Sequence, residues 1–428
     1  MGIQEGNQAA AVDPPVAAAP SRPERPATYR EIFSVRAYRH LFPSNLLSLI
    51  GDQLSKVAIA SLVLSRTGST TLAAVTYAVT YIPWVVGGPL LSSYADRLPR
   101  RRVMIACDLV RLVLTLLMAI PGAPMWVLIA LLFGSNLFGS PFNSARAALM
   151  PDLMEGDKYV VANGLDGLVR QAAQVAGFLI GGVVVWALTA RGALIADAAT
   201  FLASALLILR GVPAVGAAFP GDDTNVSLLR DTAKGVRVVF TNSVLRAYVL
   251  MFWIASAFTF AYEAIAVPYA AEIGGGSRTA GMLLAAGPLG AGIGAIVIGR
   301  ILTPQVRMRL LLPFAVLSTA ALIPIVVVQS LAVVLLLLTV AGFGSSFIVP
   351  LNSLFGRAVP TQYRGRAFGV ASSGLNLSYG VTSIAAGVIA QLPQVSDHAV
   401  VGMSGVAGTV LVLALIPIWP RDDFHRGR

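Results

Sequence analysis

Acidic and basic side chains recur inside stretches of this sequence that are otherwise almost wholly apolar. Three acid–base pairs are spaced by three or four residues: Asp52 with Lys56, Asp108 with Arg111, and Asp166 with Arg170. On a helix this spacing places both members of a pair on one face, so mutual neutralisation is the simplest interpretation. A charge at the centre of a bilayer costs about 2.5–3.5 kcal/mol on insertion scales, so each residue is also a functional candidate.

Asp52 lies close to the middle of its apolar stretch, "LIGDQLSKVAIA". A carboxylate that carries a proton or a ligand must be buried, and it needs a cation whose presence depends on conformation. Asp52 with Lys56 would supply both, so proton coupling, substrate binding and a purely structural pair all stay open. For Asp166 and Arg170 we favour a structural or gating pair.

Glu263 and Asp197 have no base nearby on their own helices. Glu263 stands among aromatic residues in "FTFAYEAIAVPYA", a setting that suits a cationic ligand or a protonation site. The alternative for Glu263 is a hydrated position in an outer vestibule. Asp197, in "LIADAATFLA", either pairs across helices or takes part in function directly.

The elements that must position these charges are membrane-spanning helices. The chain has 428 residues, of which 56% are hydrophobic and 12% charged, against about 25% charged in soluble proteins. Apolar stretches long enough to cross a bilayer occur approximately at 41–65, 71–94, 103–120, 124–147, 161–188, 192–210, 246–270, 278–300, 308–328, 330–355, 365–391 and 398–419. We therefore predict an all-α integral membrane protein with twelve transmembrane helices in two pseudo-symmetric six-helix bundles.

The basic residues predict the orientation of these spans. With twelve spans both termini share a side, and most of the 31 basic residues lie in loops on that side, whereas the opposite loops hold Arg66, Arg191 and Arg278. The predicted organisation is a disordered cytoplasmic tail at 1–36, six-helix bundles at 37–212 and 244–420, a cytoplasmic loop at 213–243, and a cytoplasmic tail at 421–428. Part of the central loop has the pattern of a helix that lies at the membrane interface. Because the bases are spread over many short loops, nucleic acid is excluded as a partner.

Two further patterns connect the halves. "PFNSARAALMP", from Pro141 to Pro151, and "PLNSLFGRAVP", from Pro350 to Pro360, share P-x-N-S-x6-P at the ends of spans four and ten. Parallel repeats of this kind are typical of transporters that rock two halves about a central site. The loop "SSYADRLPRRRV" between spans two and three adds an acid, Asp96, to a cluster of arginines. The inside-positive rule explains the arginines and leaves the acid unexplained.

Three stretches resemble the major facilitator superfamily, and in particular the prokaryotic efflux branch that includes macrolide and siderophore exporters. The loop motif of the family falls on Ser92, Asp96, Arg97, Leu98, Pro99, Arg100 and Arg101, with Ser92 and Pro99 replacing glycines. Residues 144–165 resemble the loop of this branch between spans four and five. The antiporter motif of span five falls on Gly164, Ala173, Gly177, Phe178, Gly181 and Gly182, with Phe178 in place of proline.

The resemblance implies alternating access and proton-coupled efflux of a small lipophilic compound, such as a drug, an antibiotic or another natural product. It also implies a monomer in the bacterial inner membrane with both termini cytoplasmic, and a transporter rather than an enzyme. Asp96 would latch the halves by meeting the helix N-terminus that carries Arg364 and Arg366, while Arg101 bonds within its own half. The span-five glycines would let two helices slide, or simply pack closely.

The substrate pocket and its occupant are less constrained. Pocket candidates are Tyr81, Trp84, Asn136, Gln174, Trp253, Tyr262, Asn376 and Tyr379. The alternatives to efflux are transport of a lysophospholipid or another amphiphile, nutrient uptake, and a sensor or scaffold that transports nothing. With one cysteine and three dispersed histidines, the sequence predicts no metal site. The phosphate-binding motif G-x-x-x-x-G-K-[ST] does not occur, and we expect no cofactor.

Overall fold

A computed structural model describes residues 27–85, 87, 98–214 and 228–420. Every regular element in these ranges is helical, as the sequence predicts. The N-terminal half contains α1 (Tyr29–Ser34), α2 (Arg36–Thr67), α3 (Thr70–Val79), α5 (Arg100–Met118), α6 (Met125–Leu153) and α7 (Asp157–Gly211). The helix α8 (Leu228–Thr241) follows, where the sequence predicts an interfacial helix, and it packs against α9 and α15.

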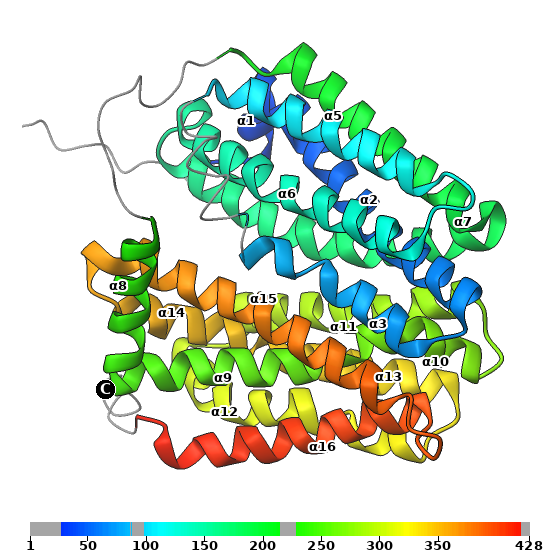
Figure 1. Ribbon diagram of the computed structural model, residues 1–428. Coiled ribbons are helices and arrows are strands. Elements are labelled where there is room, and N and C mark those ends of the chain that lie inside the picture. The colour runs from blue at the N-terminus through cyan, green and yellow to red at the C-terminus, as the bar shows by residue number, and fades with distance from the viewer. Residues whose placement is uncertain (1–26, 86, 88–97, 215–227, 421–428) are drawn as a thin grey trace, which may run out of the picture.

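The C-terminal half contains more broken helices. Its elements are α9 (Ser243–Thr259), η1 (Ala261–Ile265), α10 (Ala266–Glu272), α11 (Ser277–Ile296), η2 (Val297–Ile301), α12 (Pro304–Ala320), η3 (Ile323–Val326), α13 (Leu331–Gly344), η4 (Ser345–Phe347), α14 (Ile348–Ala358), η5 (Thr361–Tyr363), α15 (Arg364–Ile389), α16 (Asp397–Leu415) and η6 (Ile416–Ile418). Figure 1 shows α1, α2, α5, α6 and α7 in the upper part of the view and the helices of residues 243–418 in the lower part, with α3 between them beside α15.

The helices account for twelve crossings of a membrane. Eight helices in the described part of the chain are long and apolar enough to span a bilayer. One of these, α7, has 55 residues and supplies two crossings, because Thr189 has φ 67° and ψ 170° and reverses the chain there. The remaining crossings contain α3, α5 and α15, which carry more polar or charged residues or are described only in part.

Local sequence signals set several helix ends. Gly68, with φ 64°, ends α2 in the left-handed conformation that glycine adopts most easily. The side chain of Ser69 accepts a hydrogen bond from the backbone N–H of Leu72 and starts α3. The side chain of Asn242 starts α9 in the same way, by accepting from Val244 and Leu245.

The buried apolar residues show where the two halves are in contact. One cluster crosses between the halves and joins Leu54 and Phe178 to Leu283 and Ala386. Two other clusters stay within one half each, around Tyr38 in the N-terminal half and around Phe355 in the C-terminal half. The shared cluster lies toward the end of the bundle where α2 ends and α11 begins, which we call the far end. The separate clusters lie toward the basic end, where α5 and α15 begin.

Backbone contacts also close the far end. A Cβ added to Gly182 of α7 would lie 2.6 Å from the Ser277 carbonyl oxygen and 3.1 Å from the Gly281 Cα of α11. Such a close approach of two helices requires glycine at both positions. The Thr71 hydroxyl donates to the Gly387 carbonyl, which joins α3 to α15 across the halves. The structure is therefore in a conformation that is closed at the far end.

Candidate functional site

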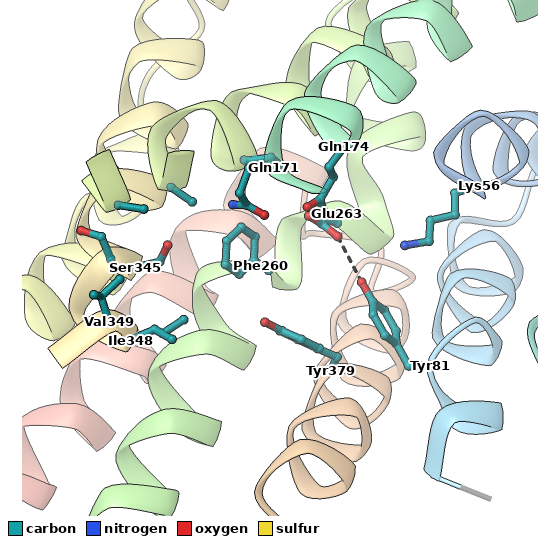
Figure 2. Close-up of a pocket in the computed structure, with 14 residues that line it drawn as sticks. Lys56, Tyr81, Gln171, Gln174, Phe260, Glu263, Ser345, Ile348, Val349 and Tyr379 are labelled. Carbon is teal, nitrogen blue, oxygen red and sulfur yellow. Dashed lines mark hydrogen bonds between the residues drawn. The ribbon is translucent and has the colours of Figure 1, made fainter. Parts of the chain in front are cut away.

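A cavity of about 400 Å³ lies between the two halves on the basic side of these contacts. It is lined by Lys56, Tyr81, Gln171, Gln174, Phe260, Glu263, Pro288, Ala291, Ala295, Ser345, Ser346, Ile348, Val349 and Tyr379. Figure 2 shows Lys56, Glu263 and Tyr81 gathered at one side, with Ser345, Ile348 and Val349 at the other. The cavity therefore has one charged pole and a wall that is largely apolar.

Glu263 forms the acidic part of the charged pole. It lies in η1, where the helix that begins as α9 breaks one turn before Pro268. Proline lacks an N–H and clashes with the preceding turn, which accounts for the irregular backbone here. The buried carboxylate accepts hydrogen bonds from the hydroxyls of Tyr77, at 2.6 Å, and Tyr81, at 3.1 Å. Both tyrosines belong to the other half, so Glu263 is not a hydrated vestibule residue.

Lys56 forms the basic part. Its Nζ lies 5.5 Å from the ring centroid of Tyr77 and 5.3 Å from that of Tyr81, within cation–π range. The same two tyrosines therefore contact both a buried base and a buried acid. An ammonium and a carboxylate from different halves face each other across these rings, and Figure 2 shows Lys56 pointing toward Glu263.

The predicted pairing of Asp52 with Lys56 is wrong. Asp52 instead forms an ion pair with Arg111 of α5, while Lys56 faces the cavity. Arg111 also donates to the Ser48 hydroxyl at 3.2 Å. The reason is geometric, since neighbouring transmembrane helices bring a guanidinium into direct contact with Asp52, whereas Lys56 extends toward the other half.

The other two predicted pairs are wrong for the same reason. Asp108 is buried and accepts a hydrogen bond from the Ser204 hydroxyl at 2.6 Å, while its expected partner Arg111 binds Asp52. Asp166 forms a buried ion pair with Arg146 of α6. Arg170, the predicted partner of Asp166, is exposed.

Asp197 bonds across helices, which is one of the two roles that the sequence leaves open. Its carboxylate accepts a hydrogen bond from the Ser55 hydroxyl of α2, and the Thr200 hydroxyl lies 3.3 Å away. The carboxylate also packs against Gly51, where any added Cβ would collide with it. Asp197 is not among the residues that line the cavity.

Three of the predicted pocket residues line the cavity, namely Tyr81, Gln174 and Tyr379. The other five have different surroundings. Trp84 packs near Gly139, and Tyr262 accepts from the Gly287 backbone. Trp253 donates to the Ala371 carbonyl, and the amides of Asn136 and Asn376 donate to carbonyls of their own helices.

The lining also contains residues that the sequence reasoning did not select, chiefly Gln171, Phe260, Ser345 and Ser346. Gln171 lies three residues before Gln174 and so shares its helix face, which was a usable signal. The serines occupy η4, a short 3₁₀ segment between α13 and α14. Breaks of this kind inside a transmembrane helix tend to line a cavity or be buried in protein.

The predicted gating loop is described only in part, because Ser92, Asp96 and Arg97 lie outside the described residues. Arg100 donates to the Ala148 carbonyl at 2.7 Å and pairs with Asp152. Arg101 donates to the Leu209 carbonyl. Both arginines therefore bind within their own half, whereas Arg364 and Arg366 are exposed at the start of α15.

The span-five motif residues divide by what they contact. A Cβ on Gly164 would meet nothing within 4 Å. Gly177 and Gly181 pack against α2 of the same half, whereas Gly182 packs against α11 of the other half. Phe178 and Ala173 are fully buried. Within the described part of the chain, no group of three or more His, Cys, Asp or Glu residues is arranged to hold a metal ion.

Comparison with known sequences shows which proteins this chain resembles. A family model described as the Major Facilitator Superfamily matches residues 41–383 and 264–426. The lysophospholipid transporter LplT of Cronobacter sakazakii is 26% identical over 411 residues, 93% of this chain and 98% of the relative. Macrolide efflux protein A of Streptococcus pyogenes is 24% identical over 218 residues, 49% of this chain and 53% of the relative.

Solved transporter structures share this architecture. The nucleoside transporter NupG superimposes with a TM-score of 0.63 at 15% identity, covering 89% of this chain and 98% of that chain. A POT family transporter in complex with a peptide conjugate gives a TM-score of 0.69 at 12% identity, covering 89% and 95%. At these identities the likeness shows the fold alone.

Proposed function

This chain belongs to the major facilitator superfamily, and from that premise we propose that it transports a single-chain amphiphile such as a lysophospholipid. The observation that carries the proposal is the cavity between the halves, which has a charged pole opposite a largely apolar wall. Its volume of about 400 Å³ suits a polar head group and the adjoining part of a hydrocarbon chain.

The charged pole has the groups that a lipid head group needs. The Lys56 ammonium would bind a phosphodiester anion, with the hydroxyl of Tyr81 as a further donor. Glu263, with the rings of Phe260 and Tyr379 nearby, would accept an ammonium group. The apolar wall formed by Pro288, Ile348 and Val349 among others would cover the acyl chain.

The curated relatives support an amphiphile more than a drug. Similarity to the lysophospholipid transporter extends over 98% of that relative, whereas similarity to the macrolide efflux protein covers 53% of its length. The sequence motifs alone favour the efflux branch. The match to the lysophospholipid transporter instead supports the lysophospholipid alternative, because it extends over 93% of this chain and so includes both halves that line the cavity.

Proton-coupled efflux of a lipophilic compound is the second candidate. It is favoured by the macrolide efflux relative, which covers about half of this chain. The same cavity would then bind the compound through its aromatic rings, and an acid such as Asp52 or Glu263 would exchange a proton for it.

Either substrate would move by alternating access, with the bundles at 37–212 and 244–420 rocking about the cavity. The far end is closed in this conformation, and the basic loops at the opposite end would lie in the cytoplasm by the inside-positive rule. We infer from the same rule that both termini are cytoplasmic, and we propose a bacterial inner membrane because these relatives are bacterial. The translocation path lies within one chain, so a monomer suffices.

Reconstitution into liposomes tests the proposal. We expect purified protein to accelerate the movement of labelled lysophosphatidylethanolamine between leaflets, and Lys56→Gln to abolish the effect because the phosphate loses its cation. Lys158→Gln removes an exposed lysine and is the matched control. Movement of a macrolide but not of the lysolipid would establish the second candidate instead, and movement of neither would contradict both.

A further inference from the structure

A second polar cluster lies inside the N-terminal half, away from the residues that line the cavity. Asp108 of α5 and Asp197 of α7 are 0% and 1% exposed. The Ser204 hydroxyl donates to Asp108 Oδ2 and is itself 2.9 Å from the Ser44 hydroxyl. The Ser55 hydroxyl donates to Asp197 Oδ2. Both acids are thus bound by hydroxyl groups and not by a base.

The charges around these acids do not balance if every carboxyl is ionised. Asp52 and Arg111 form an ion pair between α2 and α5. Among the described residues, Arg111 is the base whose charge acts on both Asp108 and Asp197; it is 4% exposed and is already paired with Asp52. Cys107 and Lys56 are the other titratable groups near this cluster. Three carboxylates around one guanidinium would leave two uncompensated negative charges in a membrane interior.

An unpartnered oxygen favours the neutral form of Asp108. Asp108 Oδ1 has no hydrogen-bond partner, and neither has the hydroxyl of Thr115, one turn beyond Arg111 on the same face of α5. A buried carboxylate oxygen without a donor is expensive, whereas the carbonyl oxygen of a neutral carboxyl group tolerates this position far better. A proton on Asp108 Oδ2 would reverse the bond to Ser204, so that the carboxyl group donates to Ser204 and Ser204 donates to Ser44.

We propose that Asp108 and Asp197 each hold a proton in this conformation and form a proton-binding site separate from the substrate cavity. The site would supply the coupling ion for the transporter, and that link alone rests on the proposed function. Within the described part of the chain, no group of three or more His, Cys, Asp or Glu residues is placed to hold a metal ion.

Arg111 connects this site to the cavity. Loss of a proton from Asp108 or Asp197 creates a new anion that competes with Asp52 for the guanidinium. Asp52 lies one helical turn from Lys56, so a released Asp52 would draw the Lys56 ammonium away from Glu263. Release of a proton would thereby change the charge presented to a substrate and to the other half of the protein.

Infrared spectroscopy of the substrate-free protein in lipid tests the site directly. Protonated carboxyl groups give a C=O stretching band that shifts in D₂O and is separate from the carboxylate bands. At neutral pH we expect Asp108→Asn and Asp197→Asn each to remove the intensity of one carboxyl group. Glu155→Gln changes an exposed acid and should leave the band unchanged. An unchanged band in either aspartate variant would overturn the site.

A milder variant covers the case in which an asparagine variant does not fold. Ser204→Ala removes the hydroxyl that bonds Asp108, so it should shift the frequency of one carboxyl band while keeping its intensity. An unshifted band would contradict protonation of Asp108. Because no substrate is present, these results are independent of whether the lysolipid assay succeeds.

Discussion

The contact between Gly182 and Gly281 should control how often the far end opens. A Cβ at Gly182 would lie 2.6 Å from the Ser277 carbonyl oxygen, 3.1 Å from the Gly281 Cα and 3.3 Å from the Arg278 Cα. All three atoms belong to the backbone of the other half, so no side chain can rotate away to make room. Gly182→Ala must therefore push α7 and α11 apart at this end.

The magnitude follows from the cost of overpacking a close contact. Inserting a methyl group into a well-packed contact costs about 1–3 kcal/mol. Only the closed conformation bears this cost, because the helices separate when the far end opens. The ratio of open to closed molecules should accordingly rise by about 5–150-fold.

Two variants in the same motif are matched controls. A Cβ at Gly181 would lie 3.0 Å from the Leu54 Cα, a contact within the N-terminal half. Gly181→Ala should thus lower stability without opening the far end. A Cβ at Gly164 would meet nothing within 4 Å, so Gly164→Ala should leave the far end closed and, because alanine favours a helix over glycine, raise stability by about 0.5–1 kcal/mol.

Double electron–electron resonance between spin labels at Thr67 and Gln329 measures the opening, with Cys107 replaced by alanine. Both labelled positions are exposed at the far end, one in each half. We expect a longer-distance population to appear in Gly182→Ala and to be weak in the parent and both controls. A parent-like distribution in Gly182→Ala, or equal opening in Gly181→Ala, would contradict control of opening by the contact between Gly182 and Gly281.

Two further predictions concern the buried charges. Arg146→Ala should lower the stability of the detergent-solubilised protein by about 3–5 kcal/mol in a thermal melt, because it leaves Asp166 buried without its partner. Arg170→Ala should change stability by about 0.5 kcal/mol or less, since Arg170 is exposed. If the two variants lost equal stability, Asp166 would be paired with Arg170 as the sequence predicts. Tyr77→Phe removes a donor to Glu263 and should weaken lysolipid transport about tenfold or more, at about 1.5–3 kcal/mol for a charged hydrogen bond. Tyr269→Phe removes a buried hydroxyl that has no partner and should leave transport unchanged, so a comparable loss there would point to general destabilisation.

The sequence by itself determined the membrane class, the positions of the spans and the family. The membrane class and the spans depend on local composition, because about 20 consecutive apolar residues suffice to cross a bilayer whatever lies around them, whereas the family is recognised from its motifs. The reversal at Thr189 and the amphipathic helix α8 also follow from local pattern. Glu263 and Lys56 could be selected as candidates because a charge inside a span is itself a signal.

The tertiary structure decided which charges act together. The spacing of residues along one helix predicts contacts within that helix only. A buried guanidinium instead binds the carboxylate that an adjacent helix places next to it. Arg111 therefore binds Asp52, and Arg146 binds Asp166. Lys56 and Glu263 are 207 positions apart by their numbering and meet only because the two halves pack around Tyr77 and Tyr81. Packing between helices thus converts separately detectable charges into one cavity and one buried polar cluster.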